Sequence, residues 1–259
     1  FARKAKIVQV DIDQTELEKT KSMVEISLNC DARDFITKLV SYLEKQKIFI
    51  AQPHDWYETC NGYRNRYPFI GPEHEDKNGF INSYKFMDQI SNYLKKDQIV
   101  VTDMGTGLLS GHQALRIKQG QRLMTSTGLG EMGYGLPGAI GASFARNKGE
   151  VLCLNCDGGM MMNLQEIQTL VHHQLPIKLF IFNNDGYLMI KHTQKNLFEG
   201  RYSGTNKSSG VSCPDFSKLS AAFNISYYSI RTWEDFHNVI PKIQEYVGPV
   251  ICDVFTDPE

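Results

Sequence analysis

The chain has 259 residues, of which 41% are hydrophobic and 22% charged, a composition that is ordinary for a folded protein of one or two domains. Its 28 basic and 29 acidic residues are evenly spread and leave a net charge of −1, so nothing suggests a nucleic-acid-binding stripe or a charged, disordered tail. No apolar run approaches the roughly 18 residues that would suggest a membrane span. Because the chain begins at Phe1 rather than Met, we expect it to be part of a longer polypeptide.

In chain order, the first 79 residues divide into an α/β part and an irregular part. Residues 5–13 read as a buried strand closed by acidic residues, and residues 32–43 read as a helix, because apolar side chains recur there at helical spacing. These side chains are Phe35, Ile36, Leu39, Val40 and Leu43. Residues 48–79 break the pattern with prolines and glycines among aromatic residues, which predicts a linker or a segment draped over the surface.

From Phe80 onward, short apolar strands alternate with helices. Strands are predicted at 99–101, 151–155, 177–182, 225–230 and 250–254, and helices at 83–95, 163–173, 216–223 and 233–246. This alternation predicts an α/β fold with a doubly wound parallel sheet and helices on both faces. Such sheets bind ligands at the carboxyl ends of their strands, where Gly-rich turns are predicted at 105–111, 157–159 and 183–186.

The six cysteines, at positions 30, 60, 153, 156, 213 and 252, are expected to be free thiols in a cytoplasmic protein, because a chain of this size needs no disulfide bridges to bury a core. Cys153 and Cys156 have the spacing of a CxxC pair. No second Cys or His pair follows at a spacing suited to zinc, and both residues fall within or at the end of a predicted strand. A metal or redox role for the pair is therefore disfavoured.

Residues 128–133 match the GxGxxG pattern of dinucleotide-binding proteins. That pattern needs an apolar strand immediately before it, whereas residues 124–127 read Met-Thr-Ser-Thr. Pro137 also interrupts what should be the first turns of the following helix. We therefore expect no nicotinamide cofactor at this segment.

Two predicted strand ends carry the residue types of a metal site. Asp157 with Gly158 and Gly159 combines a hard oxygen ligand with an anion-receptive backbone, although an Asp that only caps a helix looks the same. Asn184 lies one helix and one strand further along, so the two turns should be neighbours at the sheet edge. The Asp157 carboxylate, the Asn184 amide oxygen and the Gly186 carbonyl would then bind Mg²⁺ together with diphosphate oxygens and a water. The alternative is two unrelated turns.

The Asp-Gly and Asn-Asn elements at this spacing resemble the signature of enzymes that depend on thiamine diphosphate (ThDP). Residues 128–142, 162–166 and 184–187 resemble segments of the acetolactate synthase-like branch of that family. The resemblance implies that residues 80–259 form the diphosphate-binding domain, that residues 1–47 are the end of a central Rossmann-like domain, and that residues 48–79 link them. It also implies that the pyrimidine-binding domain, with its catalytic glutamate, is absent from this chain.

The resemblance assigns roles to individual residues. It implies that Met132 is the wedge that bends the cofactor into its V shape, which suits a large apolar side chain among glycines, although core packing is the alternative. It implies that the Gly130 carbonyl receives the 4′-amino group. The implied cofactor-binding residues are Gly105, Thr106, Gly130, Met132, Asp157, Gly158, Gly159, Asn184, Gly186, Tyr187 and Leu188. Met162, Met189 and Thr193 are candidate substrate residues.

The sequence departs from the family pattern at two positions. Cys156 stands where the family usually has the first glycine of Gly-Asp-Gly; a cysteine there cannot easily take a positive φ, but the metal ligands follow it, so we expect binding to survive. Thr193 stands where acetolactate synthases share a Trp that screens the second 2-oxo acid. This second departure argues against a role in branched-chain amino-acid synthesis.

The implied activity is ThDP- and Mg²⁺-dependent decarboxylation of a 2-oxo acid, pyruvate in the simplest case, with transfer of the acyl unit to an acceptor. The implied assembly is a homodimer or homotetramer with active sites at the subunit interface, and FAD remains an open possibility. The alternatives are a simple 2-oxo acid decarboxylase and a remnant that binds ThDP without turnover. Since Glu131 and Glu166 lie on the wrong domain to replace the missing glutamate, we expect this chain alone to be half an active site.

Overall fold

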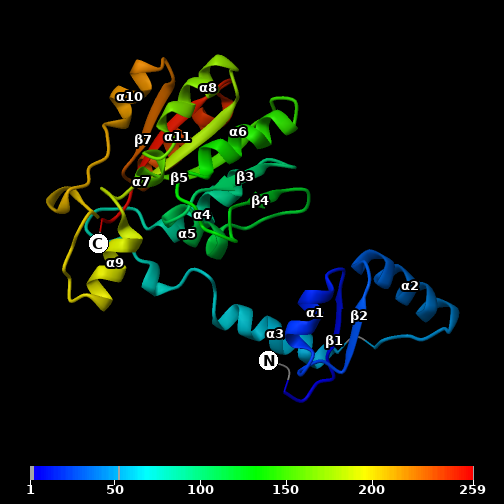
Figure 1. Cartoon of the computed structure of the whole chain (residues 1–259). Helices are drawn as coiled ribbons and strands as arrows, with labels where there is room; N and C mark the ends of the chain where they lie inside the picture. The colour runs from blue at the N-terminus through cyan, green and yellow to red at the C-terminus, as the bar shows by residue number, and fades with distance from the viewer. Residues whose placement is uncertain (1–2, 52, 259) are drawn as a thin grey trace. The chain divides into compact units, whose positions relative to one another are not determined.

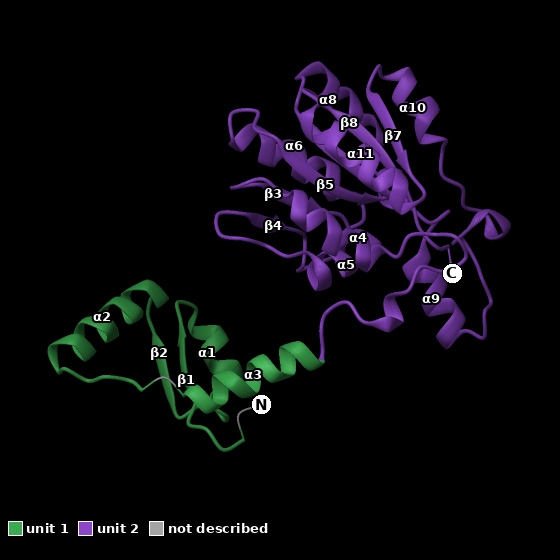
Figure 2. Cartoon of the chain, turned by 180° about the vertical axis from the view of Figure 1, so that it is seen from behind, with its two compact units in different colours: residues 1–66 green, residues 67–259 purple. Residues whose placement is uncertain are grey.

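The computed structural model describes residues 3–51 and 53–258. The chain forms two compact units, residues 1–66 and residues 67–259 (Figure 2). The boundary falls inside the segment that the sequence predicts as a linker.

The first unit contains a small parallel sheet and three helices. Strands β1 (Val8–Asp11) and β2 (Ile26–Asn29) pair in parallel, helix α1 (Gln14–Thr20) connects them, and helix α2 (Ala32–Lys45) follows. The strand predicted at 5–13 is shorter than expected, and none of the residues of β1 is buried, contrary to the prediction. The helix predicted at 32–43 is confirmed and extends two residues further, to Lys45.

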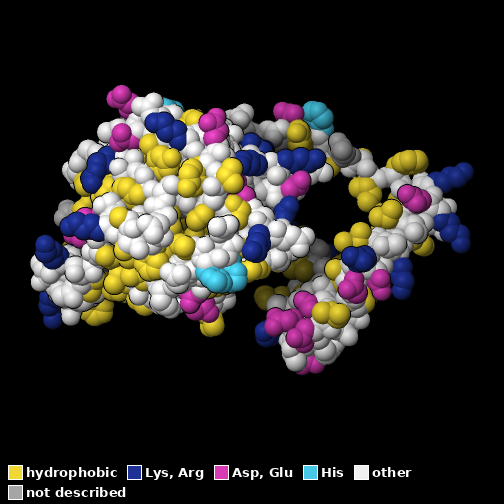
Figure 3. Space-filling view, turned by 90° about the horizontal axis from the view of Figure 1, so that it is seen from above, with side chains coloured by type: hydrophobic (Ala, Val, Ile, Leu, Met, Phe, Trp, Pro, Cys, Tyr) yellow, Lys and Arg dark blue, Asp and Glu magenta, His cyan; other side chains and the backbone are white. Residues whose placement is uncertain are grey.

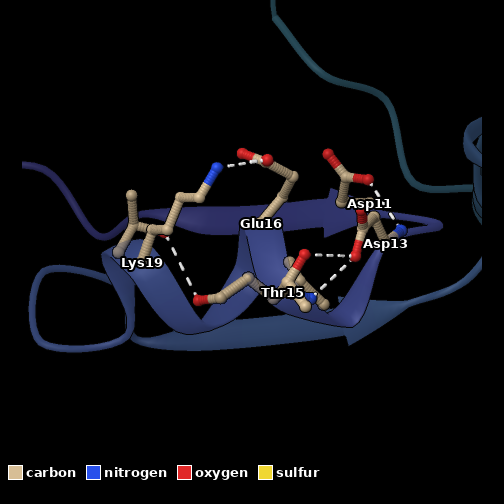
Figure 4. A network of polar contacts seen from close by, with 7 residues as sticks. Asp11, Asp13, Thr15, Glu16 and Lys19 are labelled. Atoms are coloured by element: carbon tan, nitrogen blue, oxygen red, sulfur yellow. Dashed lines mark hydrogen bonds and ion pairs between the residues drawn. The ribbon is translucent and has the colours of Figure 1, made fainter.

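The start of α1 shows why the chain becomes helical directly after β1. The Asp13 carboxylate accepts hydrogen bonds from the backbone N–H and the hydroxyl of Thr15, at 2.8 and 2.6 Å (Figure 4). Lys19 forms an ion pair with Glu16 one turn further on. An acidic N-cap satisfies backbone N–H groups that have no partner within the helix.

Helix α3 (His54–Arg66) occupies much of the segment that was expected to be an irregular linker. The prolines and glycines that suggested irregular structure do not prevent it, because Pro53 immediately precedes the helix, where a missing N–H costs little. The residues of α3 are mostly polar and none is buried, so the sequence shows no apolar stripe of the kind that indicates α2.

The second unit is built on a six-stranded parallel sheet with the strand order β4-β3-β5-β6-β8-β7 (Figure 1). The strands are β3 (Ile99–Thr102), β4 (Arg122–Met124), β5 (Val151–Cys156), β6 (Ile177–Asn183), β7 (Ser226–Ile230) and β8 (Val250–Phe255). Every residue of β5 is buried, as a sheet that is covered on both faces requires. The predicted doubly wound α/β fold is confirmed.

Helices cover the two faces of this sheet with two separate apolar cores. One core packs α4 (Ser83–Ile90) and α11 (Trp233–Glu245) against side chains such as Phe180 and Phe182. The other packs α6 (Gly135–Ala145), α8 (Ile167–His172) and α10 (Phe216–Ala222) against side chains such as Leu179 and Ile181. Alternate residues of β6 thus enter opposite cores, which fixes the strand in register.

The remaining elements lie near the strand ends and differ most from expectation. They are α5 (Thr106–Ala114), α7 (Asp157–Met160), α9 (Leu188–Leu197) and the 3₁₀ turns η1 (Pro72–His74), η2 (Ser91–Tyr93), η3 (Leu164–Glu166) and η4 (Lys207–Ser209). The predicted Gly-rich turn at 105–111 is largely helix α5. A side-chain carbon on Gly107 would lie 2.5 Å from the Leu154 carbonyl oxygen, so this glycine permits close helix–strand packing and does not mark a turn.

Pro137 does not interrupt α6, contrary to expectation, because it lies within the first turn of the helix, where proline is tolerated. The short edge strand β4, which was not predicted, also ends at Met124. Both arguments against the dinucleotide pattern at 128–133 are therefore weaker than they appeared.

Two further expectations concern the chain as a whole. All six cysteines are free, as predicted. Among the described residues, no helix is both long enough and apolar enough to cross a membrane. On the face shown in Figure 3, basic and acidic side chains are interspersed, in line with the balanced composition.

Candidate functional site

Segments that follow β3, β5 and β6 line one cavity of about 370 Å³ at the carboxyl edge of the sheet, together with the Gly-rich loop that precedes α6. The cavity brings together ten of the predicted cofactor residues, namely Gly105, Thr106, Gly130, Met132, Gly158, Gly159, Asn184, Gly186, Tyr187 and Leu188. Met189, a candidate substrate residue, also lines it. The sequence reasoning assigned no cofactor or substrate role to the other five lining residues, Met104, Leu108, Leu109, Cys156 and Ile190.

Asp157 lies beneath this cavity and ties the two predicted turns together. Because β5 and β6 pair in parallel, the chain leaves both strands at the same edge. The backbone N–H groups of Gly186 and Asn184 donate to Oδ2 of Asp157 at 2.9 and 3.2 Å, and the N–H of Gly158 donates to Oδ1 at 2.8 Å. Complete burial of the side chain raises the pKa of Asp157 to about 6, although these N–H groups oppose the rise.

Asn184 presents an unused acceptor at the same place. Its Nδ2 donates to Oγ1 of Thr106 at 3.2 Å, whereas its Oδ1 is buried and has no hydrogen-bond partner among the described residues. A buried acceptor without a partner costs about 1–3 kcal/mol. A cation bound at this oxygen would remove that cost.

Oxygen atoms of three different kinds could serve as metal ligands here. They are the carboxylate of Asp157, the side-chain amide oxygen of Asn184 and the carbonyl of Gly186, which lies 3.3 Å from the position of a side-chain carbon built on Gly158. In the part of the chain that the structure describes, no three His, Cys, Asp or Glu side chains form a metal-binding group. A single carboxylate with neutral oxygen donors suits Mg²⁺ that also binds phosphate oxygens, so the residues fit the implied metal.

Glycines make room for a ligand between these segments. A side-chain carbon on Gly158 would lie 2.4 Å from the ring of Tyr187. Gly105 has a φ of 99° and precedes α5 without any side-chain cap, so the positive end of the α5 dipole faces the cavity. The site thus offers backbone that no side chain covers, together with a positive electrostatic potential that favours an anion.

Cys156 does not strain the backbone as the comparison with Gly-Asp-Gly suggested. Its φ of −122° and ψ of 154° are extended, so this position needs no glycine. The thiol accepts a hydrogen bond from the N–H of Gly107 at 3.3 Å, and burial raises the pKa of the Cys156 thiol well above its usual value. The cysteine therefore fits the wall of the cavity as a neutral side chain.

The structure does not bring Met162 and Thr193 to the cavity wall. Met162 is 46% exposed and packs beside Gly133. Thr193 is exposed on α9, and its hydroxyl donates to the Met189 carbonyl at 3.1 Å. Of the three candidate substrate residues, only Met189 borders the cavity.

Asp103 is the main polar residue near the cavity that sequence reasoning missed. It follows β3, is completely buried, and accepts a hydrogen bond at Oδ1 from the N–H of Gly135 at 3.0 Å. Burial raises the pKa of Asp103 to about 6. The same signal that revealed Asp157, an acidic residue directly after a buried strand, was present in the sequence.

A parallel α/β sheet with a glycine-lined cavity and hard oxygen donors at its carboxyl edge defines a domain that binds a phosphate-bearing cofactor. Residues 103–254 match the family described as thiamine pyrophosphate enzyme, C-terminal TPP binding domain. The chain belongs to this family, whose cofactor is ThDP under its other name. The family resemblance in the sequence is thereby confirmed.

Acetolactate synthases are among the whole proteins with similar sequences. The chain is 32% identical over 254 residues to the acetolactate synthase large subunit of Porphyra purpurea, covering 98% of this chain and 42% of that protein. It is 30% identical over 262 residues to the acetolactate synthase isozyme 1 large subunit of Escherichia coli K12, covering 100% and 44%. The chain therefore spans less than half the length of these relatives.

Proposed function

We propose that this chain is the cofactor-holding part of an enzyme that uses ThDP and Mg²⁺ to decarboxylate a 2-oxo acid, pyruvate in the simplest case, and transfers the acyl unit to an acceptor. One observation carries the proposal. Asp157 and Asn184, from neighbouring strand ends, meet under a glycine-lined cavity, and Oδ1 of Asn184 has no partner among the described residues. Membership in the thiamine pyrophosphate family supplies the cofactor.

In this proposal the polar floor of the cavity holds the charged end of the cofactor. Asp157, Asn184 and the Gly186 carbonyl would bind Mg²⁺, while the backbone around Gly105 and Gly158 would receive the diphosphate. Thr106 supports this arrangement, because its hydroxyl accepts from Nδ2 of Asn184 and so turns Oδ1 of that amide away from Thr106. When bound, ThDP supplies the carbanion chemistry that loss of carbon dioxide requires.

The apolar residues of the cavity have a different task. Leu108, Leu109, Leu188 and Ile190 border it together with Met132. Such a wall excludes water from the reacting end of the cofactor and strengthens the electrostatic interactions there. Met132, a large apolar side chain beside Gly130, is proposed to press against the cofactor and hold its bent shape.

The second half of the active site is proposed to come from outside this chain. Glu131 is exposed and bonded to Ser126, and Glu166 accepts from the Thr169 hydroxyl; neither lines the cavity. The activating glutamate would therefore belong to a pyrimidine-binding domain, supplied by a neighbouring subunit of a homodimer or homotetramer. Exposed apolar residues on the segments that form the cavity, such as Leu129 (85% exposed) and Ile190 (45%), support such a cover. Residues 1–47 would be the end of the central domain.

Calorimetric titration of the complete protein with ThDP, with Mg²⁺ or with a chelator, tests the cofactor assignment. We expect binding that depends on Mg²⁺, and its absence would overturn the proposal. Product analysis with pyruvate alone and with added aldehyde, ketone or sugar acceptors then tests the reaction. Free aldehyde as the main product in every case would indicate a simple decarboxylase, and binding without turnover would indicate a remnant.

A further inference from the structure

Asp103 lies at the junction of three segments of the cofactor cavity. It follows β3, and its own N–H donates to the Leu154 carbonyl of β5 at 2.9 Å. The next residues in the chain, Met104 and Gly105, line the cavity, but Asp103 itself does not. Its side chain is completely buried, which is costly for a carboxylate without a counter-charge.

The Asp103 carboxylate holds the loop that carries Met132. Oδ1 accepts from the N–H of Gly135 at 3.0 Å, and the N–H groups of Gly133 and Tyr134 also interact with the carboxylate. At the other end of the loop, Met104 contacts Gly130 so closely that a side-chain carbon there would lie 2.2 Å from the methionine methyl. Met132 thus lies between two points that Asp103 and Met104 fix.

The second carboxylate oxygen of Asp103 faces the glycine turn after β5. Oδ2 is buried and has no hydrogen-bond partner among the described residues, and a side-chain carbon built on Gly159 would lie only 1.7 Å from it. Any side chain at position 159 would therefore displace the carboxylate. The Met132 loop and the Gly158–Gly159 turn are held at a fixed spacing through this one side chain.

We propose that Asp103 is a positioning residue that fixes the Met132 loop against the glycine turn that begins α7. It does not touch the cavity, so it acts through Met132 and the backbone. The consequence for catalysis rests on the proposed function, because only a bound cofactor gives the position of Met132 a chemical meaning. The mechanical part stands without any cofactor.

Hydrogen exchange read by mass spectrometry in the cofactor-free chain tests the mechanical part. Asp103→Ala removes the carboxylate that accepts from the N–H of Gly135, so the peptide that covers residues 128–136 should exchange about tenfold faster or more. Asp103→Asn keeps the shape and one oxygen for Gly135, and it should restore most of the protection. Peptides from β6 and β8 should exchange at unchanged rates, which would show that the fold is intact.

Gly159→Ala tests the same link from the opposite side and remains informative if Asp103→Ala fails to fold. Its methyl group would push Oδ2 of Asp103 away, so the 128–136 peptide should again exchange about tenfold faster. In the Asp103→Ala background the methyl meets no carboxylate, and Gly159→Ala should add less than about a twofold effect. If either single variant folds and leaves the loop within about twofold of the unaltered chain, the inference is wrong.

The catalytic part is measured in the complete protein with ThDP and Mg²⁺. Asp103→Ala should leave ThDP affinity within about threefold while it slows deuterium exchange at C2 of the cofactor about tenfold, because geometry and not binding is lost. Asp253→Ala is the matched control, since Asp253, within β8, is also a buried carboxylate with one unpartnered oxygen, but it receives bonds from Asn183 and Tyr227 and not from the Met132 loop. Equal slowing in both variants would overturn the catalytic part. Failure of the unaltered protein to bind ThDP would instead overturn the proposed function and leave the loop result standing.

Discussion

The two units of the chain differ in how completely they bury their apolar side chains. In residues 67–259 two cores cover both faces of the sheet, and strands such as β5 are buried along their whole length. In residues 1–66, Leu17 is the one buried hydrophobic residue of the described part, and the predicted stripe of α2 remains open, with Ile36 58% exposed. A cavity with buried charges needs a rigid surround, and only the second unit provides it.

The comparison predicts that the two units behave differently when separated. Residues 67–259 expressed alone should fold and unfold cooperatively, whereas residues 1–66 alone should lack a cooperative transition, because a two-stranded sheet with one buried apolar side chain cannot offset the entropy of ordering. Circular dichroism during thermal unfolding measures both fragments. A sharp transition in residues 1–66 would show that this unit is self-sufficient and that the comparison is wrong.

The next prediction concerns only the second unit, whose buried residues form the cavity. Asp157→Ala should weaken Mg²⁺-dependent ThDP binding about 100-fold or more, since a charged ligand is lost from a buried metal site. Asp185→Asn is the matched control: it removes a charge from the same turn, but Asp185 is exposed and its φ of 59° suits asparagine equally well. Titration calorimetry compares the two. Equal affinities in both variants would contradict the role of Asp157 as a ligand.

Sequence reasoning succeeded where a buried strand leads directly into a polar residue. Asp157 and Asn184 could be paired because consecutive parallel strands share an edge, and the observed Asp157–Asn184 bond follows from that geometry. Asp103 gave the same local signal, but its contacts with Gly135 and Gly159 join segments that are distant in the chain, and no spacing rule indicates them.

The missed helices have physical reasons of their own. Helices α3 and α9 lack the regularly spaced apolar residues by which α2 is recognised from the sequence. Helix α5 was read as a turn because its glycines serve close packing against β5, as at Gly107. Periodicity indicates a helix only where apolar residues recur on one face, and it fails where a helix is mostly polar or where glycine replaces a side chain.

Buried carboxylates also give the second unit a characteristic dependence on pH. Burial raises the pKa of Asp103, Asp157 and Asp253 to about 6 from an ordinary value of 3.8. A raised pKa means that the folded state binds the proton more tightly, so this stability is present below pH 3.8 and is lost as the pH rises through about 6. Each of the three carboxylates should therefore cost the cofactor-free chain about 1–3 kcal/mol of stability between pH 4 and pH 7.

Urea unfolding of residues 67–259 at several pH values, without Mg²⁺, measures this loss. Asp103→Asn and Asp253→Asn should each reduce it, because an amide does not titrate. Addition of Mg²⁺ and ThDP should reverse part of the loss at pH 7, since a cation stabilises the ionised Asp157. Stability that rises steadily from pH 4 to pH 7 in the cofactor-free chain would mean that these carboxylates are paired or hydrated in solution.

The contrast between buried and exposed residues recurs within the second unit, between the floor of the cavity and Thr193 on α9. Thr193 does not line the cavity, so it can contact only an acceptor that extends beyond the lining residues. If a Trp at this position normally closes the pocket around a small 2-oxo acid, the exposed Thr193 leaves room for such a larger acceptor. Because the Thr193 hydroxyl donates its hydrogen to the Met189 carbonyl, it can only accept a bond from such a substrate. We therefore expect the complete protein to form acetolactate poorly and to prefer a bulkier, hydroxyl-bearing acceptor.

Thr193→Trp should move this preference back by about 1 kcal/mol, or roughly fivefold in the ratio of kcat/KM for acetolactate to kcat/KM for the larger acceptor, because apolar contact with one small substrate is worth no more than about 1–3 kcal/mol. The exposed position should accept the indole without disturbing the core. Thr193→Val keeps the shape and removes the hydroxyl, so it separates the loss of polarity from the gain of bulk. Competition assays with both acceptors measure the three ratios. If the unaltered protein already forms acetolactate as fast as dedicated acetolactate synthases assayed alongside, the missing Trp does not set the reaction, and the acceptor must be chosen by residues outside this chain.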